Sequence, residues 1–195
     1  MSESVAIVTG ASQGIGRASA IRLARDFSAI ALVARNRQHL NDTAAKVQAA
    51  GAEPLVLDLD LREPASAQTV VSRTLERFGR IDALLNIAGA VPQIDLFEMT
   101  DAQWDDGMAL KLHGARRLTL RAWDALKAAQ GAVVLISGNS AEFPKAPYAA
   151  VGTINAAIVA LARRSGQQRS SGPGHDRPPP FLSREVGAGA QSQPG

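Results

Sequence analysis

The most constraining feature of the chain lies at its start, where an apolar strand runs directly into a glycine-rich turn and the beginning of a helix. Residues 5–16 read Val-Ala-Ile-Val-Thr-Gly-Ala-Ser-Gln-Gly-Ile-Gly. Glycines in such a turn let the backbone bend sharply and approach a ligand with no Cβ in the way. The helix that follows points its free N–H groups and positive dipole end at the same place, which suits a phosphate. The segment therefore favours a dinucleotide pyrophosphate site; the alternative is a tight strand-to-helix turn that binds nothing.

The spacing of these glycines does not identify the site by itself. Gly10, Gly14 and Gly16 are spaced G-x-x-x-G-x-G, one step different from the G-x-G-x-x-G fingerprint of dinucleotide-binding folds. The choice between a phosphate site and an empty turn therefore depends on the rest of the chain.

Strand-like and helix-like segments alternate after this turn. The apolar runs expected to form strands are 5–8, 29–34, 55–59, 81–85 and 132–137, and the helix-period stretches are 17–26, 38–50, 64–78 and 101–129. Strands separated by helices of this length predict crossover connections and a parallel sheet. The predicted fold class is α/β, a doubly wound parallel sheet with helices on both faces (Rossmann-like), whose ligands bind at the carboxyl ends of the strands.

Three motifs at those strand ends are shared with a known family. The matching residues are Thr9, Gly10, Gly14 and Gly16 of a Thr-Gly-x-x-x-Gly-x-Gly motif, Asp60 after the third strand, and Asn86, Ala88 and Gly89 of an Asn-Asn-Ala-Gly motif whose second Asn is Ile87 here. On these residues the chain, over 4–163, resembles the short-chain dehydrogenase/reductase family.

The resemblance implies a nicotinamide dinucleotide site built by the matched motifs. The residues expected to bind or shape it are Thr9, Gly10, Ser12, Gln13, Gly14, Ile15, Gly16, Arg35, Asp60, Asn86, Ala88 and Gly89. By the same resemblance, Asp60 would hydrogen-bond the adenine amine, Asn86 would tie the sheet to neighbouring backbone, and Gly89 would let the chain pass close to the cofactor. The alternative for Asp60 is a charge near the start of the next helix, ahead of Pro64.

The end of the second apolar run indicates which nicotinamide cofactor is preferred. A carboxylate there would accept from the ribose 2′-hydroxyl and repel a 2′-phosphate, but this chain has Ala34 followed by Arg35. A guanidinium group suits a phosphate. We therefore predict NADP(H) over NAD(H), with Arg35 as the principal contact and Arg37 as a second. In the alternative interpretation Arg35 is a solvated loop charge, and Gln13 is not the basic residue that often accompanies NADP preference in the family.

The catalytic half departs from the family pattern at all four expected positions. Family members use a Tyr that gives or takes the proton, a Lys four residues later, a Ser thirteen residues before the Tyr, and an Asn in the preceding helix. An isolated phenol titrates at about pH 10, so it needs a fixed cation nearby to act at neutral pH. Aligned without gaps, the chain has Val151 for the Tyr, Asn155 for the Lys, Gly138 for the Ser and Lys111 for the Asn.

Two hypotheses follow for this half of the chain. In one, the proton donor has moved to Tyr148, which lies three residues before Val151 on nearly the same helix face, displaced by about 4.5 Å. Lys111 would then supply the cation, and Ser137 or Ser140 the substrate contact, for hydride transfer between the nicotinamide and a carbonyl or alcohol. In the other, the site is lost, and the chain is a nucleotide-binding pseudoenzyme with an interaction or sensing role, or a defective fragment.

Composition restricts the partners. The chain carries 21 basic and 18 acidic residues, but residues 1–162 carry 16 of each, so no basic patch for nucleic acid is implied. Cysteine is absent, and His113 has no ligand-spaced neighbour, so no metal site is expected. With no apolar run of membrane-spanning length and no signal-peptide core at the start, we expect a cytoplasmic protein with no membrane partner, acting on a small-molecule carbonyl or alcohol.

The domain prediction is one nucleotide-binding domain over 1–163, followed by a tail, 164–195, that is disordered or an aberrant terminus. The tail is rich in Gly, Pro, Ser and Gln and shows no apolar periodicity. Relatives continue with two further strands, a helix and a substrate flap, so we expect the last strands to be missing. The fifth strand would then be a sheet edge with uncovered apolar surface, which predicts poor solubility or marginal stability. The resemblance implies a homodimer through the helices 101–129 and 148–163, which would cover part of that surface.

Overall fold

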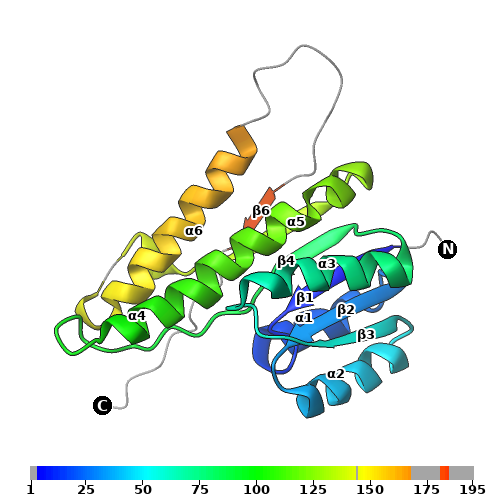
Figure 1. Ribbon diagram of the computed structural model, residues 1–195, viewed down its shortest axis with the longest axis horizontal. Coiled ribbons are helices and arrows are strands. Elements are labelled where there is room, and N and C mark those ends of the chain that lie inside the picture. The colour runs from blue at the N-terminus through cyan, green and yellow to red at the C-terminus, as the bar shows by residue number, and fades with distance from the viewer. Residues whose placement is uncertain (1–3, 144, 168–180, 185–195) are drawn as a thin grey trace, which may run out of the picture.

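The computed structural model describes residues 4–143, 145–167 and 181–184, which form one parallel sheet with helices on both faces (Figure 1). The strands are β1 (Val5–Thr9), β2 (Ala29–Ala34), β3 (Glu53–Asp58), β4 (Ala83–Asn86), β5 (Ala132–Ile136) and β6 (Phe181–Arg184). Their order is β3-β2-β1-β4-β5-β6, and all neighbours are parallel. This is the order of doubly wound dinucleotide-binding sheets, so the predicted fold class is confirmed.

The helices follow the predicted stretches closely. They are α1 (Gly14–Leu23), α2 (Arg37–Ala49), α3 (Pro64–Phe78), α4 (Asp101–Gly107), α5 (Ala115–Ala128) and α6 (Ala149–Gln167). The predicted helix over 101–129 is one continuous rod in Figure 1, but its central segment, Met108–Gly114, is a π-helix. A π-helical segment inserts an extra residue into a turn and is frequent at functional sites.

Two apolar clusters cover the two faces of the sheet. Ile7 and Val33 point to the face covered by α3, α5 and α6, whereas Val8 and Leu32 point to the face covered by α1 and α2. All four side chains are fully buried. This pattern explains why the strands read as continuous apolar runs rather than alternating ones, because both faces of a parallel sheet are covered by helices.

Local sequence signals set several helix ends. Pro64 occupies the first turn of α3, and Gly79 ends that helix in the left-handed conformation at φ 75°. The side chain of Asn36 accepts from the backbone N–H of His39 and caps α2. Thr100 and Gln103 form a reciprocal capping box at the start of α4.

The prediction that the sheet ends at the fifth strand is wrong. Phe181–Arg184 forms β6, which pairs in parallel with Val133–Ile136 of β5 and makes β5 an interior strand. The helix α6 also continues beyond the predicted boundary at 163, to Gln167. The other predictions for the tail concern residues 168–180 and 185–195, which lie outside the described part of the chain.

Strand β5 is covered better on one face than on the other. Val133 and Leu135 are buried, while Val134 and Ile136, which alternate with them, are only partly buried by the described residues. The expectation of uncovered apolar surface beside the fifth strand therefore remains for one face, although the strand is not an edge.

The stretch Ala146–Arg163, most of which lies in α6, is long and apolar enough to span a membrane by length and composition alone. The expectation that the chain has no apolar run of that length is therefore wrong. Ala150, Ile154 and Ile158 of this helix are 2%, 0% and 2% exposed, and Ile158 belongs to the main core cluster. These residues line one face of α6, which is the pattern of a core helix in a globular fold.

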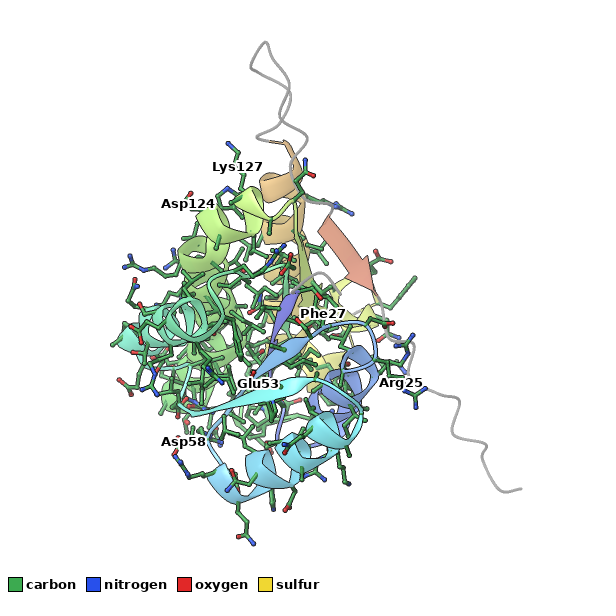
Figure 2. All side chains as sticks on the ribbon, turned by 90° about the vertical axis from the view of Figure 1, so that its right-hand side faces the viewer. Arg25, Phe27, Glu53, Asp58, Asp124 and Lys127 are labelled. Atoms are coloured by element: carbon green, nitrogen blue, oxygen red, sulfur yellow. The ribbon has the colours of Figure 1, made fainter. Side chains whose placement is uncertain are left out.

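The carboxyl ends of the parallel strands all lie at one edge of the sheet. Figure 2 shows Glu53 and Asp58 at the two ends of β3, of which Asp58 marks the carboxyl end. Asp124 and Lys127, near the C-terminal end of α5, lie far from it in the same view.

Candidate functional site

A cavity of about 730 Å³ lies where the strand order reverses between β1 and β4. Its volume is within the range of about 300–1,000 Å³ that small-molecule and cofactor sites occupy. The predicted cofactor residues that line it are Gly10, Ser12, Gln13, Gly14, Ile15, Gly16, Arg35, Asp60, Ala88 and Gly89. The structure therefore brings together the three motifs that the sequence placed at separate strand ends.

The glycine turn forms part of the cavity wall with its own backbone. Gly10 has φ 68°, and a Cβ on it would lie 3.1 Å from the backbone nitrogen of Ala88. A Cβ on Gly16 would collide with the carbonyl oxygen of Gly10. Side chains at these two positions would push the turn open, so the backbone can approach a ligand only because both residues are glycine.

The N-terminus of α1 suits an anion. Its cap residue, Gln13, makes no side-chain capping bond, and the first turn contains no acidic residue. The nearest cation in sequence, Arg17, is turned back on the chain, where its guanidinium donates to the carbonyl of Ser12 at 2.5 Å and to the hydroxyl of Thr43 at 3.2 Å. The first backbone N–H groups of this described helix are thus free to bind the pyrophosphate of a dinucleotide.

Arg35 and Arg37 lie in different surroundings. Arg35 is part of the cavity wall, its side chain is 63% exposed, and its guanidinium is 3.7 Å from a carboxylate oxygen of Asp60. Arg37 pairs with Asp58 at 2.8 Å, and this hydrogen bond lowers the pKa of the Asp58 carboxyl below its ordinary value. Arg37 is absent from the residues that line the cavity, so the structure separates it from Arg35.

Asp60 serves the turn after β3 as well as the cavity wall. One of its carboxylate oxygens accepts from the backbone N–H of Arg62 at 3.0 Å and from the Arg62 guanidinium at 3.3 Å. Arg62 also binds Asp106 of α4, with its Nη2 at 2.7 Å from Oδ2. The residue that caps α3 is Glu63, and Asp60 lies in the turn just before it, so both interpretations of Asp60 stay open.

Thr9 and Asn86 support the cavity without lining it. The hydroxyl of Thr9 accepts from the backbone N–H groups of Ile87 and Ala88, both at 2.9 Å, and donates to the carbonyl of Leu85 at 3.2 Å. The amide of Asn86 donates to the hydroxyl of Thr119 on α5 at 3.2 Å, a side-chain partner rather than the backbone partner expected. These bonds fix the turn after β4 against β1.

Several wall residues were missed by the sequence analysis. They are Val33, Ala34, Asn36, His39, Leu59, Leu61, Ile87, Ala90 and Leu110. Two of them, Asn36 and His39, could have been identified from the sequence, because Asn36 is a typical helix cap. A helix that begins directly after Arg35 brings its first turn to the same wall of the cavity.

The π-helical segment carries Lys111 alongside the cavity. The alkyl chain of Lys111 runs over Gly89, since a Cβ at that glycine would lie 3.1 Å from its Cδ. Gly89 lines the cavity, as does Leu110, the residue before Lys111. The glycine predicted to make room for the cofactor thus also makes room for this lysine.

Three of the four altered family positions form one connected cluster. The ammonium of Lys111 donates to Oδ1 of Asn155 at 2.5 Å, and Nδ2 of Asn155 donates to the hydroxyl of Ser140 at 2.9 Å. The hydroxyl of Ser137 donates to the backbone carbonyl of Asn155 at 3.1 Å. A Cβ on Gly138 would lie only 2.9 Å from Nδ2 of Asn155, so the missing side chain at 138 provides the space for that amide.

Burial lowers the pKa of the Lys111 ammonium below its ordinary value of 10.5. Its hydrogen-bond partner, the Asn155 amide, is neutral and 2% exposed as a residue. Among the described residues no carboxylate lies within 4.0 Å of the amine.

Tyr148 takes part in none of the hydrogen bonds that connect this cluster. It ends the short 3₁₀ turn Ala146–Tyr148 just before α6 and is partly buried. In the structure as described, the hydrogen bond of Lys111 goes to Asn155 and not to the phenol of Tyr148. Ser137, Ser140 and Lys111 are therefore brought together as expected, and the proposed pairing of Tyr148 with Lys111 is not formed.

Solved structures with the same fold include nicotinamide-bound oxidoreductases. A metagenomic short-chain oxidoreductase in complex with NADP superposes with a TM-score of 0.86 at 28% identity, over 95% of this chain and 82% of that one. An alcohol dehydrogenase from the archaeon Thermococcus sibiricus, complexed with 5-hydroxy-NADP, gives a TM-score of 0.85 at 27% identity, over 93% and 74% of the two chains. An NAD⁺-bound xylitol dehydrogenase gives 0.80 at 27% identity, over 85% and 64%.

Curated relatives are similar over part of their length. A short-chain reductase from Streptomyces niveus is 38% identical over 59% of this chain and 44% of its own, and an NAD-dependent oxidoreductase from Mycobacterium tuberculosis is 32% identical over 73% and 57%. The chain thus spans about half the length of these relatives. The family model for short chain dehydrogenases matches residues 4–170, which is most of the chain. On this match and the shared fold, the chain belongs to the short-chain dehydrogenase/reductase family.

Proposed function

We propose that this chain binds NADP(H) in the cavity between β1 and β4 and transfers a hydride between the nicotinamide and a small-molecule carbonyl compound or alcohol. The family membership, the cavity at the strand switch point and the uncapped start of α1 support this function. The nicotinamide supplies the hydride chemistry. The backbone of the glycine turn binds the pyrophosphate, and the other lining residues form the walls of the cavity.

The preference for NADP(H) depends on one observation, the position of Arg35. Its guanidinium is exposed at the cavity wall, directly after β2, where a carboxylate would select the unphosphorylated ribose. Asp60 is its ion-pair partner at 3.7 Å, a distance that leaves the guanidinium free to bind a 2′-phosphate by charge-assisted hydrogen bonds.

The test of cofactor choice is a titration of the full chain with NADPH and with NADH, followed by the fluorescence of Trp104 and Trp123. We expect tighter binding of NADPH, and we expect Arg35→Ala to weaken NADPH by roughly 10- to 100-fold, since hydrogen bonds to charged groups contribute about 1.5–3 kcal/mol. NADH affinity should change little. Arg37→Ala is the matched control, because Arg37 is engaged by Asp58 outside the cavity. Equal affinity for both nucleotides, unchanged by Arg35→Ala, contradicts the NADP preference.

The test of turnover is the oxidation of NADPH in the presence of a panel of ketones and aldehydes. Consumption of NADPH that depends on the carbonyl compound supports the oxidoreductase. Saturable NADPH binding without turnover on a broad panel would instead support the pseudoenzyme, whose role would be interaction or sensing.

We further propose that the chain acts as a homodimer in the cytoplasm, pairing through the α4–α5 rod and α6. Leu120 on α5 supports this pairing, because it is a large apolar side chain that is 62% exposed. Light scattering on a size-exclusion column tests it. A monomeric mass at micromolar concentration contradicts the dimer, and Leu120→Lys should convert a dimer to a monomer.

A further inference from the structure

We propose that the ε-amine of Lys111 is the proton donor and acceptor of the hydride-transfer reaction, held for that task by the side-chain amide of Asn155. The inference depends on the proposed oxidoreductase function and assigns its acid and base. It replaces the phenol that the family uses, and that Tyr148 was expected to supply, with an amine.

The position of Lys111 carries the argument. Its alkyl chain packs over Gly89 in the cavity wall, and its neighbour Leu110 lines the same wall. The π-helical segment Met108–Gly114 sets the direction of this lysine, because the wider turn changes which residues face α6. The lysine side chain therefore runs past Gly89 of the cavity wall and ends with its amine at Asn155 of α6.

The hydrogen-bond directions around Asn155 follow from the lysine. An ammonium can only donate, so the atom of Asn155 that faces it must be the carbonyl oxygen, and Nδ2 must face Ser140. The hydroxyl of Ser140 accepts from Nδ2 and keeps its own hydrogen, which it can donate to a substrate oxygen. The hydroxyl of Ser137 already donates its hydrogen to the backbone carbonyl of Asn155. Ser140 rather than Ser137 is thus the substrate contact.

The surroundings of the amine suit a group that must both hold and release a proton. Among the described residues, the amine is shown to hydrogen-bond the uncharged Asn155 amide on α6, while the alkyl chain of Lys111 lies against Gly89 after β4. Asp106, earlier on the same rod, is engaged by Arg62. Because burial lowers the pKa of Lys111, its amine loses its proton more readily than the amine of an ordinary lysine does.

A bound reduced nicotinamide would supply the hydride, with its electron pair, for the new C–H bond at the carbonyl carbon. The electron pair of the C=O π bond moves to oxygen, which takes a proton from the ammonium of Lys111. The nicotinamide is oxidised, the carbonyl is reduced to an alcohol, and the neutral amine regains its proton from water. Oxidation of the alcohol runs through the same steps in reverse.

The first experiment needs no turnover. The full chain is treated with a trace of acetic anhydride over a range of pH, and acetylation of each lysine is followed by mass spectrometry. We expect Lys111 to react with a midpoint pH below that of the exposed Lys46, and we expect saturating NADPH to protect Lys111 but not Lys46. If NADPH binds and leaves Lys111 unprotected, the inference is overturned while the cofactor site stands. If NADPH does not bind at all, the proposed function and the inference fail together.

A variant tests the positioning role of Asn155. Asn155→Asp places a carboxylate against the amine and should raise the midpoint pH for acetylation of Lys111, because an opposite charge favours the ammonium. A purely structural role for Asn155 would leave that midpoint unchanged, and such a result contradicts the positioning role.

The second experiment compares carbonyl reduction by variants of the two rival donors. Lys111→Met removes the amine, and Lys111→Arg keeps a cation that cannot release its proton. We expect both to reduce kcat by at least about 100-fold, which is the usual contribution of a general acid, while Lys46→Met leaves it unchanged. The rival hypothesis, with Tyr148 as the acid, expects that loss in Tyr148→Phe and partial activity in Lys111→Arg. A 100-fold loss in Tyr148→Phe, or near-normal kcat in Lys111→Met, overturns the proposal.

Discussion

The two halves of this molecule relate to their family in opposite ways. The nucleotide half, from β1 to the turn after β4, keeps the family motifs, and each of them meets at one cavity. In the half from α4 to α6, an ungapped alignment places Lys111, Gly138, Val151 and Asn155 at the positions expected for the family's catalytic side chains. Both halves nevertheless belong to the same sheet and the same core cluster.

The side chains at these positions form a connected cluster. In the ungapped alignment Lys111 takes the place of the family asparagine and Asn155 that of the family lysine, and the two side chains are hydrogen-bonded at 2.5 Å. Gly138, which replaces the family serine, clears the space that the Asn155 amide occupies. Independent losses would leave unmatched polar groups or voids at these positions, whereas the three changes here fit one another.

The largest expected effect concerns the nucleotide half, in which the Thr9 hydroxyl holds the turn after β4. Thr9→Val removes the acceptor of two backbone N–H groups beside a 1%-exposed site. Leaving buried N–H groups unsatisfied costs about 1–3 kcal/mol each, so we expect the free energy of unfolding to fall by roughly 2–4 kcal/mol. Urea denaturation measures it. Thr9→Ser keeps the hydroxyl and should lose much less; equal losses in the two variants would show that the hydroxyl bonds are not the cause.

The next effect tests whether the altered half is a fitted unit. Gly138→Ser introduces a Cβ 2.9 Å from the Asn155 amide, and overpacking of this kind typically costs about 1–3 kcal/mol. In an Asn155→Ala background the same substitution should cost less than about 0.5 kcal/mol, because the obstructing amide is gone. A double-mutant cycle measures the coupling. Additive effects would mean that the two positions changed independently.

The smallest effect concerns the ion pair of Arg62 with Asp106, which links the nucleotide half to α4. Arg62 holds the pKa of the Asp106 carboxyl below its usual value of 3.8. The unfolded chain therefore binds the proton more readily, so the stabilisation is present above about pH 4 and is lost as the pH falls through the folded-state pKa. Because Asp106 is largely exposed, Asp106→Asn should reduce stability at pH 7 by at most about 1 kcal/mol. Urea denaturation at successively lower pH should show that difference shrink as the carboxyl of the folded protein takes up its proton; a difference that does not change with pH has another origin.

Much of the fold could be predicted because local and long-range preferences agree. The second strand and the helix over 64–78 match the structure at both ends, the helix because Pro64 and Gly79 mark its limits. Strand β6 could not be predicted, because a four-residue strand in a Pro- and Gly-rich tail is fixed by its hydrogen bonds to β5 and not by its own pattern. The π-helical segment was also missed, since its sequence reads as ordinary helix.

The candidate site divides in the same way. Motif residues such as Gly10 and Arg35 could be placed at the cavity because the carboxyl ends of parallel strands converge. Lys111 and Asn155 were recognised as altered positions, but they are 44 residues apart, and their contact depends on how α6 packs against the rod that contains the π-helical segment. Thr9 was expected to bind or shape the cofactor site, and its hydroxyl is hydrogen-bonded to the chain's own backbone beside that site.

The interlocking of Lys111, Asn155 and Gly138 has an evolutionary consequence. Reverting Gly138 alone to serine drives a side chain into the Asn155 amide, and reverting Asn155 alone to lysine sets a second ammonium against Lys111. Each single substitution toward the family pattern is therefore expected to be unfavourable, so a chain with these three residues would be held in this arrangement by epistasis.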